Sequence, residues 1–205
     1  MKKTLSIALI SILAILLLTA CKNNGSSVLK NTVSSAILTT EQQEILDLLA
    51  VPNNQELMVF VFDTEESYRG FEVWVEVYQD GEIIERPAGV SLHSDPATKR
   101  NGRMAVMIMQ NNNGYQWTLS VIENGAKSSH IGETQIEIET GLGRAYGPMS
   151  GSVNIEDGNE IIIYSSTFQE ANVPHAAYDE QTLMERPELL NDYPYAFIVK
   201  CKFSK

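Results

Sequence analysis

Apolar and polar residues alternate along much of the chain, which is the pattern of strands that bury one face. In residues 70–79 the apolar side chains fall on one face, and the other face mixes carboxylates with aromatic rings. The first set is Phe71, Val73, Val75 and Val77; the second is Glu72, Trp74, Glu76 and Tyr78. Residues 57–62 are apolar on both faces, as a central strand would be. Related patterns predict strands at 82–84, 103–109, 115–122, 133–140, 153–155, 160–167 and 195–203.

Turn-forming residue pairs separate several of these strands. Asp80-Gly81, Asn124-Gly125 and Asp157-Gly158 fit two-residue turns, in which the central residues adopt positive φ angles. We therefore expect a hairpin at each of the three pairs. Residues 87–102 and the glycine-rich stretch 141–147 lack clear alternation and are interpreted as loops.

Two short helices are expected beside the strands. Thr40 and Gln43 form a capping-box pattern ahead of apolar residues at helical spacing, and Pro52 ends a helix over 41–50. A second helical stretch, 180–191, is split by Pro187, since proline disfavours helix at the residue before it. The chain is therefore predicted to be mainly β, as an antiparallel sandwich or barrel of eight or nine strands with two short flanking helices.

The N-terminus has the pattern of an export signal. Two lysines precede a mostly apolar run over 5–18, which is shorter than the roughly 20 residues of a spanning helix. The run ends in Leu18-Thr19-Ala20-Cys21, which resembles the lipobox of bacterial lipoprotein precursors. The resemblance implies cleavage after Ala20, a lipid on Cys21 and an extracytoplasmic protein anchored to a bacterial membrane. The alternative is an ordinary secretory signal followed by a chance cysteine.

These features predict three regions along the chain. Residues 1–20 are the signal peptide, residues 21–40 are the lipidated cysteine with a polar, flexible tether, and residues 41–205 are a single β-rich domain. No later segment reaches 18 consecutive apolar residues, so we expect no second membrane span.

Charge limits the partners of such a domain. The chain has 15 Lys and Arg against 26 Asp and Glu, a net charge of −11, and removal of the two lysines in the signal makes it −13. An acidic protein binds nucleic acid poorly, because phosphate contacts need basic patches. Cations, basic peptides, neutral glycans and envelope proteins remain possible partners.

The second cysteine, Cys201, is expected in the core. If Cys21 carries the lipid, Cys201 has no partner for an internal disulfide. It lies on the apolar face of the last predicted strand, where a buried cysteine acts as a small apolar side chain. A reactive thiol is the alternative.

Trp74, Tyr78, Glu72 and Glu76 are the candidate ligand-binding residues. Aromatic rings beside carboxylates on one sheet face suit stacking against a sugar ring and hydrogen bonding to its hydroxyl groups. The alternative is that a helix or a second sheet covers these aromatic rings as part of the core.

Other patterns in the chain do not identify a catalytic or metal site. The glycines of 141–147 lack the spacing and the following helix of a nucleotide loop, and no serine sits in a G-x-S-x-G elbow. The three histidines lack metal-ligand spacing. Met104, Met107 and Met109 could bind Cu(I) through their thioethers, but three methionines on a strand more simply pack in the core. The outward carboxylates could bind Ca²⁺ or form a solvated face; they are Glu133, Glu137 and Glu139, or Glu72 and Glu76. Neither a cofactor nor a metal is predicted.

The function expected from the sequence is therefore a membrane-anchored binding or interaction module with an unidentified ligand. A cell-envelope hydrolase with an unidentified active site and a metal-handling lipoprotein are the alternatives. Nucleic acid is not an expected partner.

Overall fold

A computed structural model describes residues 30–48, 55–112, 114–170 and 178–205. The chain divides into two compact units, one of residues 1–28 and 38–51 and the other of residues 29–37 and 52–205. The described part of the first unit contains α2 (Thr40–Leu48). Thr39 and Gln42 form its capping box, with the Thr39 N–H donating to Gln42 Oε1 at 2.9 Å and the Gln42 N–H donating to Thr39 Oγ1 at 3.3 Å. The predicted capping pair, Thr40 and Gln43, is therefore wrong by one residue.

The second unit is an antiparallel sheet of ten strands. The strands are β1 (Thr32–Ser35), β2 (Gln55–Gln79), β3 (Glu82–Glu85), β4 (Gly89–Asn111), β5 (Gly114–Glu123), β6 (Ala126–Thr134), β7 (Leu142–Pro148), β8 (Ser152–Asn154), β9 (Glu160–Glu170) and β10 (Tyr195–Ser204). The main order is β6-β5-β4-β2-β10-β9-β7, while β1 and β3 also pair with β2, and β8 pairs with β1. The predicted mainly β, antiparallel fold is confirmed.

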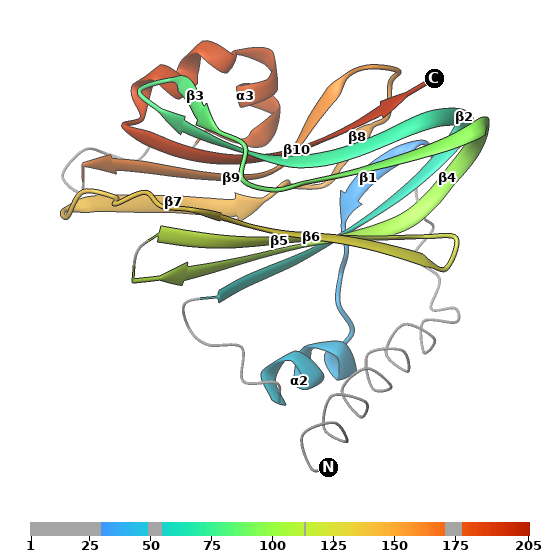
Figure 1. The fold of residues 1–205 in the computed structure, drawn as a ribbon, viewed down its shortest axis with the longest axis horizontal. Coiled ribbons are helices and arrows are strands. Elements are labelled where there is room, and N and C mark those ends of the chain that lie inside the picture. Colours follow the sequence, from blue (N-terminus) through green and yellow to red (C-terminus); the bar gives the residue numbers. More distant parts are fainter. Residues whose placement is uncertain (1–29, 49–54, 113, 171–177) are drawn as a thin grey trace. The chain divides into compact units, whose positions relative to one another are not determined.

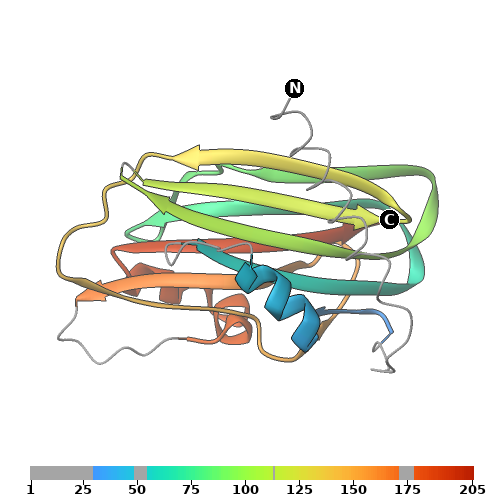
Figure 2. The same cartoon turned by 90° about the horizontal axis from the view of Figure 1, so that it is seen from below.

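The sheet curls so that β5 and β6 lie opposite β9 and β10 (Figures 1 and 2). Tyr115 and Trp117 on β5 meet the ring of Phe197 on β10 edge to face, with centroids 4.7 and 5.3 Å apart. The inward side chains form one apolar core, which includes Cys201. The expected burial of Cys201 is confirmed, and burial raises the pKa of its thiol.

Two long strands make the curl possible. The first half of β2 pairs with β4 on one side and β1 on the other, while its second half pairs with β4 and β10. The pairing with β4 is interrupted between Asp63 and Ser67 and again between Tyr68 and Gly70. The buried side chain of Arg100 lies at this bend, with Nη1 donating to Glu123 Oε2 at 2.7 Å.

Short helices cover part of the outer face of the sheet. α3 (Glu180–Glu185) and η1 (Pro187–Asp192), the latter a 3-10 helix, pack on β9 and β10 through a second apolar cluster (Figure 1). This cluster consists of Tyr78, Ile162, Leu183, Leu189, Leu190, Ala196 and Ile198. The predicted break at Pro187 is confirmed. Within the described residues, no helix is sufficiently long and apolar to cross a membrane.

Four local predictions are wrong. Residues 89–102 belong to β4 and residues 142–147 belong to β7, although both were expected as loops. The strand expected at 133–140 ends at Thr134. The third hairpin is absent because β8 pairs with β1, and β9 pairs with β10 and β7.

The predicted tether also contains regular structure. Residues 32–35 form β1, which pairs with β2 and β8, and Val33 is fully buried. The β-rich fold therefore begins before residue 41. Cys21 and the predicted signal peptide lie outside the described residues.

Candidate functional site

The four predicted ligand-binding residues lie on the outer face of β2, and three of them contact one another. Glu76 is only 1 % exposed. Its carboxylate accepts hydrogen bonds from Trp74 Nε1 at 3.0 Å and from the Tyr78 hydroxyl at 2.6 Å. It also forms ion pairs with Arg86 at 2.6 Å and Lys200 at 2.8 Å. Both oxygens of this carboxylate are therefore occupied by donors from the protein itself.

This network sets the charge states of its members. Burial by itself raises the pKa of Glu76, but hydrogen bonds from Lys200, Tyr78 and Trp74 outweigh burial and lower it to about 2. Burial and the hydrogen bond to Glu76 raise the pKa of Tyr78 to about 12. Glu76 is thus an internal anion in a satisfied network, which is a structural arrangement.

The remaining features of this face bear on sugar binding. Lys202 Nζ lies 6.0 Å from the centroid of the Trp74 ring, and a sugar stacked on that side of the ring would displace the ammonium group. Glu72 is half-buried and pairs across the sheet with Ser91 and Lys202. The ligand-binding role of these four residues stays a prediction.

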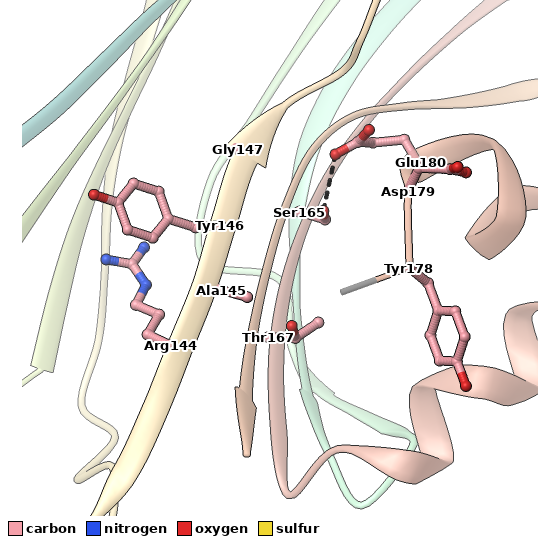
Figure 3. Close-up of a pocket in the computed structure, with 9 residues that line it drawn as sticks. All are labelled: Arg144, Ala145, Tyr146, Gly147, Ser165, Thr167, Tyr178, Asp179 and Glu180. Carbon is pink, nitrogen blue, oxygen red and sulfur yellow. Dashed lines mark hydrogen bonds between the residues drawn. The ribbon is translucent and has the colours of Figure 1, made fainter. Parts of the chain in front are cut away.

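A second candidate site is a depression between β7, β9 and the start of α3 (Figure 3). Its volume is about 420 Å³, and hydroxyl groups of Ser165 and Thr167 line it from β9. In Figure 3, the Glu180 carboxylate points toward Ser165, whereas the side chains of Tyr178 and Asp179 point away from β7. The depression therefore combines a partly apolar lining with hydroxyl groups and the carboxylate of Glu180.

Small residues on β7 keep this depression open. Gly147 pairs with Ser165, and Ala145 pairs with Thr167, so each pair shares the outer face. A Cβ atom on Gly147 would have no heavy atom within 4 Å beyond its chain neighbours. The side chains of Arg144 and Tyr146 lie on the opposite side of β7 (Figure 3).

Glu180 is the most unusual group of the depression. It is 9 % exposed, and the one hydrogen bond that its carboxylate receives within the described residues comes from Ser165 Oγ, at 3.0 Å from Oε1. Among those residues, no Lys, Arg or His side chain lies within the 4.0 Å of an ion pair with it. A buried carboxylate without a cation is costly, so the depression favours a positively charged group.

The inner side of β7 holds a further polar cluster. Arg144 forms an ion pair with Glu56 at the start of β2, and its Nη2 donates to the Tyr164 hydroxyl at 2.8 Å. Arg144 Nε donates to Ser166 Oγ at 2.6 Å, and the Tyr164 hydroxyl donates to Glu56 Oε2 at 2.8 Å. Burial raises the pKa of Tyr164 well above its ordinary value. These groups satisfy one another and connect two separate strands.

The other candidate ligands are dispersed. Among the residues that the structure describes, no three His, Cys, Asp or Glu side chains come close enough together to hold a metal ion. Met104 is buried in the core. His130 Nδ1 lies 3.0 Å from the backbone of Gly89, and His175 lies outside the described residues.

Sequence reasoning missed the depression. The available signal was the change from apolar residues to Ser165, Ser166 and Thr167 within one strand, since hydroxyl groups there require a polar partner. That partner, Glu180, is assigned to a helix start by its own sequence context, and only the packing of α3 on β9 brings the two together.

Comparison with known proteins gives one match. No curated protein and no solved structure matches the chain significantly. The family model described as the YgaN domain matches residues 32–203, which begin at β1 and end in β10. The matched range covers most of the chain and coincides with the observed sheet. The chain therefore belongs to the YgaN domain family.

Proposed function

We propose that this protein is an extracytoplasmic binding module held on a bacterial membrane by a lipid on Cys21. The anchoring rests on the export pattern and the lipobox-like residues 18–21. Because β1 begins at Thr32, about ten residues separate the anchor from the sheet. At about 3.3–3.6 Å per residue, that link extends at most roughly 35 Å, which keeps the domain near the membrane surface.

The depression beside β7 is the observation that supports a binding role. Its volume of about 420 Å³ lies within the range of small-ligand sites. Within the described residues the buried Glu180 carboxylate has one neutral hydrogen-bond donor and no cation, and a ligand with an ammonium or guanidinium group would supply a cation. The net charge of −11 attracts such ligands from a distance.

The hydrolase and metal-handling alternatives lack a comparable arrangement within the described residues. A hydrolase needs a nucleophile next to a base, and a metal site needs three or more converging ligands. Ser165 does donate to the Glu180 carboxylate at 3.0 Å, but within the described residues no third group contacts that carboxylate to orient it as a catalytic base. We therefore favour binding over either alternative.

Anchoring is tested by metabolic labelling with an alkyne-tagged palmitate in a bacterial host. We expect label on the wild-type chain, and a membrane-bound protein that added protease cleaves in intact cells or spheroplasts. Cys21→Ser should lose the label and leave the membrane fraction. An unlabelled wild-type chain released into the medium or periplasm would contradict the lipid anchor.

Binding is tested by thermal unfolding of the full chain in mild detergent with amines, basic peptides, envelope glycans and divalent metals. A ligand at 100 times its dissociation constant adds about 2.7 kcal/mol, or several degrees in Tm. We expect amines or basic peptides to give this shift. Gly147→Leu should remove it by filling the depression, and Ala126→Leu, at an exposed position of β6, should retain it. A shift with glycans alone, lost in Trp74→Ala, would place the site on β2 instead.

A further inference from the structure

β7 is an edge strand, and one of its sides carries unpaired backbone groups. It ends the strand order, next to β9. The Met149 N–H donates to the Ile163 carbonyl oxygen at 2.9 Å, just beyond the end of β7. Residues of an antiparallel strand alternate between bonding their neighbour and facing away from it. Gly147 and Ala145 therefore bond β9, while Tyr146, Arg144 and Leu142 direct their N–H and C=O groups to the free side.

The two edges of the sheet differ in what lies beside them. At β6, Gly132 lies so close to the Pro87 carbonyl oxygen that an added Cβ would collide with it, and the Gly89 backbone lies beside His130. Gly132 and His130 pair with the core residues Trp117 and Leu119, so residues 87–89 lie against the inner face of β6 beside that edge. Within the described residues, no backbone hydrogen bond is made to the free side of β7. An unpaired edge of this kind is a template for a further strand.

The depression lies within reach of a strand added to β7. Such a strand would lie about 4.8 Å from β7 and about 10 Å from β9, which are one and two strand spacings. Its outward side chains would pass over Ala145 and Gly147, where only small groups stand. An extended lysine or arginine side chain, together with one hydrogen bond, spans this distance to the Glu180 carboxylate beside Ser165.

We propose that an extended, basic segment of a partner polypeptide adds to the sheet along β7 and places a lysine or arginine side chain against Glu180. This inference rests on the proposed binding function and names its ligand class. The backbone edge of β7 supplies main-chain hydrogen bonds, and the depression supplies charge recognition. Pro148 has no N–H, so the paired region covers Leu142 to Tyr146.

Two other occupants fit the structure less well. A free polyamine would use Glu180 but leave the backbone groups of β7 unpaired. A second copy of this chain would pair β7 with β7, but each copy carries a net charge of −11, so approach is opposed by repulsion. A basic segment uses both features and is attracted by the same charge.

The test uses the full chain in mild detergent and a set of acetylated, amidated heptapeptides with alternating threonine and valine. Each peptide carries one lysine, moved through all positions, and has a matched glutamine version. Binding is followed by isothermal titration calorimetry. We expect the best lysine peptide to bind at least tenfold tighter than its glutamine version. In Glu180→Gln, which retains a partner for Ser165, this difference should vanish.

Backbone pairing is tested separately from charge recognition. Peptides N-methylated at alternate residues should fall into two groups, because only every second amide faces β7. Methylation of the amides that face β7 should weaken binding at least tenfold, and methylation of the others should leave it unchanged. Gly147→Leu should weaken the best peptide to a similar extent, while Ala126→Leu should bind it like wild type. Circular dichroism and Tm establish that each variant is folded.

Several results would overturn the inference while leaving a binding function intact. One is that spermine binds as tightly as the best peptide, and another is that N-methylation weakens no peptide. A third is that the protein forms a dimer in analytical ultracentrifugation and that Gly147→Leu abolishes this dimer. Binding of glycans or metals with no peptide binding would also overturn it. If no ligand of any class binds, the proposed function fails together with it.

Discussion

Two glutamates at the outer face of the sheet, Glu76 on β2 and Glu180 at the start of α3, show how neighbours decide the role of a residue. Glu76 is buried and receives donors from Trp74, Tyr78 and two cationic side chains. Glu180 is 9 % exposed, against 1 % for Glu76, and within the described residues its carboxylate receives one hydroxyl donor. The first arrangement is complete in itself and stabilises the fold, while the second is the one that we propose as a ligand site.

The Glu76 network predicts a specific loss of stability in acid. The pKa of Glu76 is about 2 in the folded protein and near 4.5 in the unfolded chain. The ionised carboxylate therefore contributes fully to the free energy of unfolding above pH 4.5, and this contribution is lost as the pH falls toward 2. At 1.36 kcal/mol per pKa unit, the pH-dependent part amounts to at most about 3 kcal/mol. Glu76→Gln should therefore have a lower free energy of unfolding than wild type at pH 6, and this difference should be smaller at pH 2.5.

The measurement is urea unfolding of both proteins across this pH range. Glu133→Gln, at an exposed position of β6, provides the control and should follow wild type throughout. If the difference in free energy of unfolding between Glu76→Gln and wild type stays constant from pH 6 to pH 2.5, that result would contradict the lowered pKa of Glu76.

The role of Trp74 is separable from that of Glu76. Trp74→Phe keeps a ring for stacking but removes the indole N–H that bonds Glu76, so we expect a loss of about 1–2 kcal/mol in the free energy of unfolding. Trp74→Ala also removes the ring. If the face binds glycans, Trp74→Phe should bind them and Trp74→Ala should not; equal glycan binding by wild type and both variants would end that hypothesis.

At the scale of elements, strands that lack an apolar alternation were the hardest to predict. Residues 89–102 contain many exposed polar side chains, yet they extend β4 because their backbone pairs with β2. β7 combines glycines with Arg144 and Tyr146, a composition typical of loops. In both cases the strand is held by long-range backbone hydrogen bonds, which leave little trace in the local pattern.

β1 allows a direct test of where the folded domain begins. Val33 is 0 % exposed in the core, whereas Ile37, four residues later, is 95 % exposed. We expect Val33→Ala to lower the free energy of unfolding by about 2 kcal/mol, because it leaves a cavity. Ile37→Ala should change it by less than about 0.5 kcal/mol. Chemical denaturation measures both, and equal stability of the two variants would show that β1 is dispensable.

At the scale of the whole sheet, the Arg144–Glu56 pair connects the last strand in the order to the beginning of β2. Both side chains are 21 % exposed, and Tyr164 and Ser166 complete their hydrogen bonds. The pair joins strands that are not neighbours in the sheet, so it helps to hold the curl.

A double-mutant cycle measures this connection. Glu56→Gln and Arg144→Met should show a coupling of about 1–2 kcal/mol in the free energy of unfolding, because removing either partner leaves the other half-buried and unpaired. The exposed pair of Arg186 and Glu188, 3.1 Å apart, is the matched control and should show no measurable coupling. Additive effects at Glu56 and Arg144 would mean that the pair does not hold β7.

The sequence by itself determined the features that depend on residues close in the chain. The alternation of apolar and polar residues correctly predicted the mainly β fold, and Pro187 correctly predicted the break between the two helical segments. Asp80-Gly81 and Asn124-Gly125 gave the two hairpins that form, where all four residues have positive φ. At Asp157-Gly158 only Gly158 has positive φ, and the neighbouring strands pair elsewhere. The lipid anchor stays a prediction from the first 21 residues.

Only the tertiary structure decided which distant segments meet. It pairs Thr32 with Asp63 and Asn154, and it places Gly147 beside Ser165. It also brings Glu180 to Ser165, 15 residues away in the chain, with no cationic side chain of the described residues in ion-pair distance of that carboxylate. Such contacts depend on sheet order and helix packing, which many sequences with the same local pattern would arrange differently. The candidate depression therefore depends on these long-range contacts.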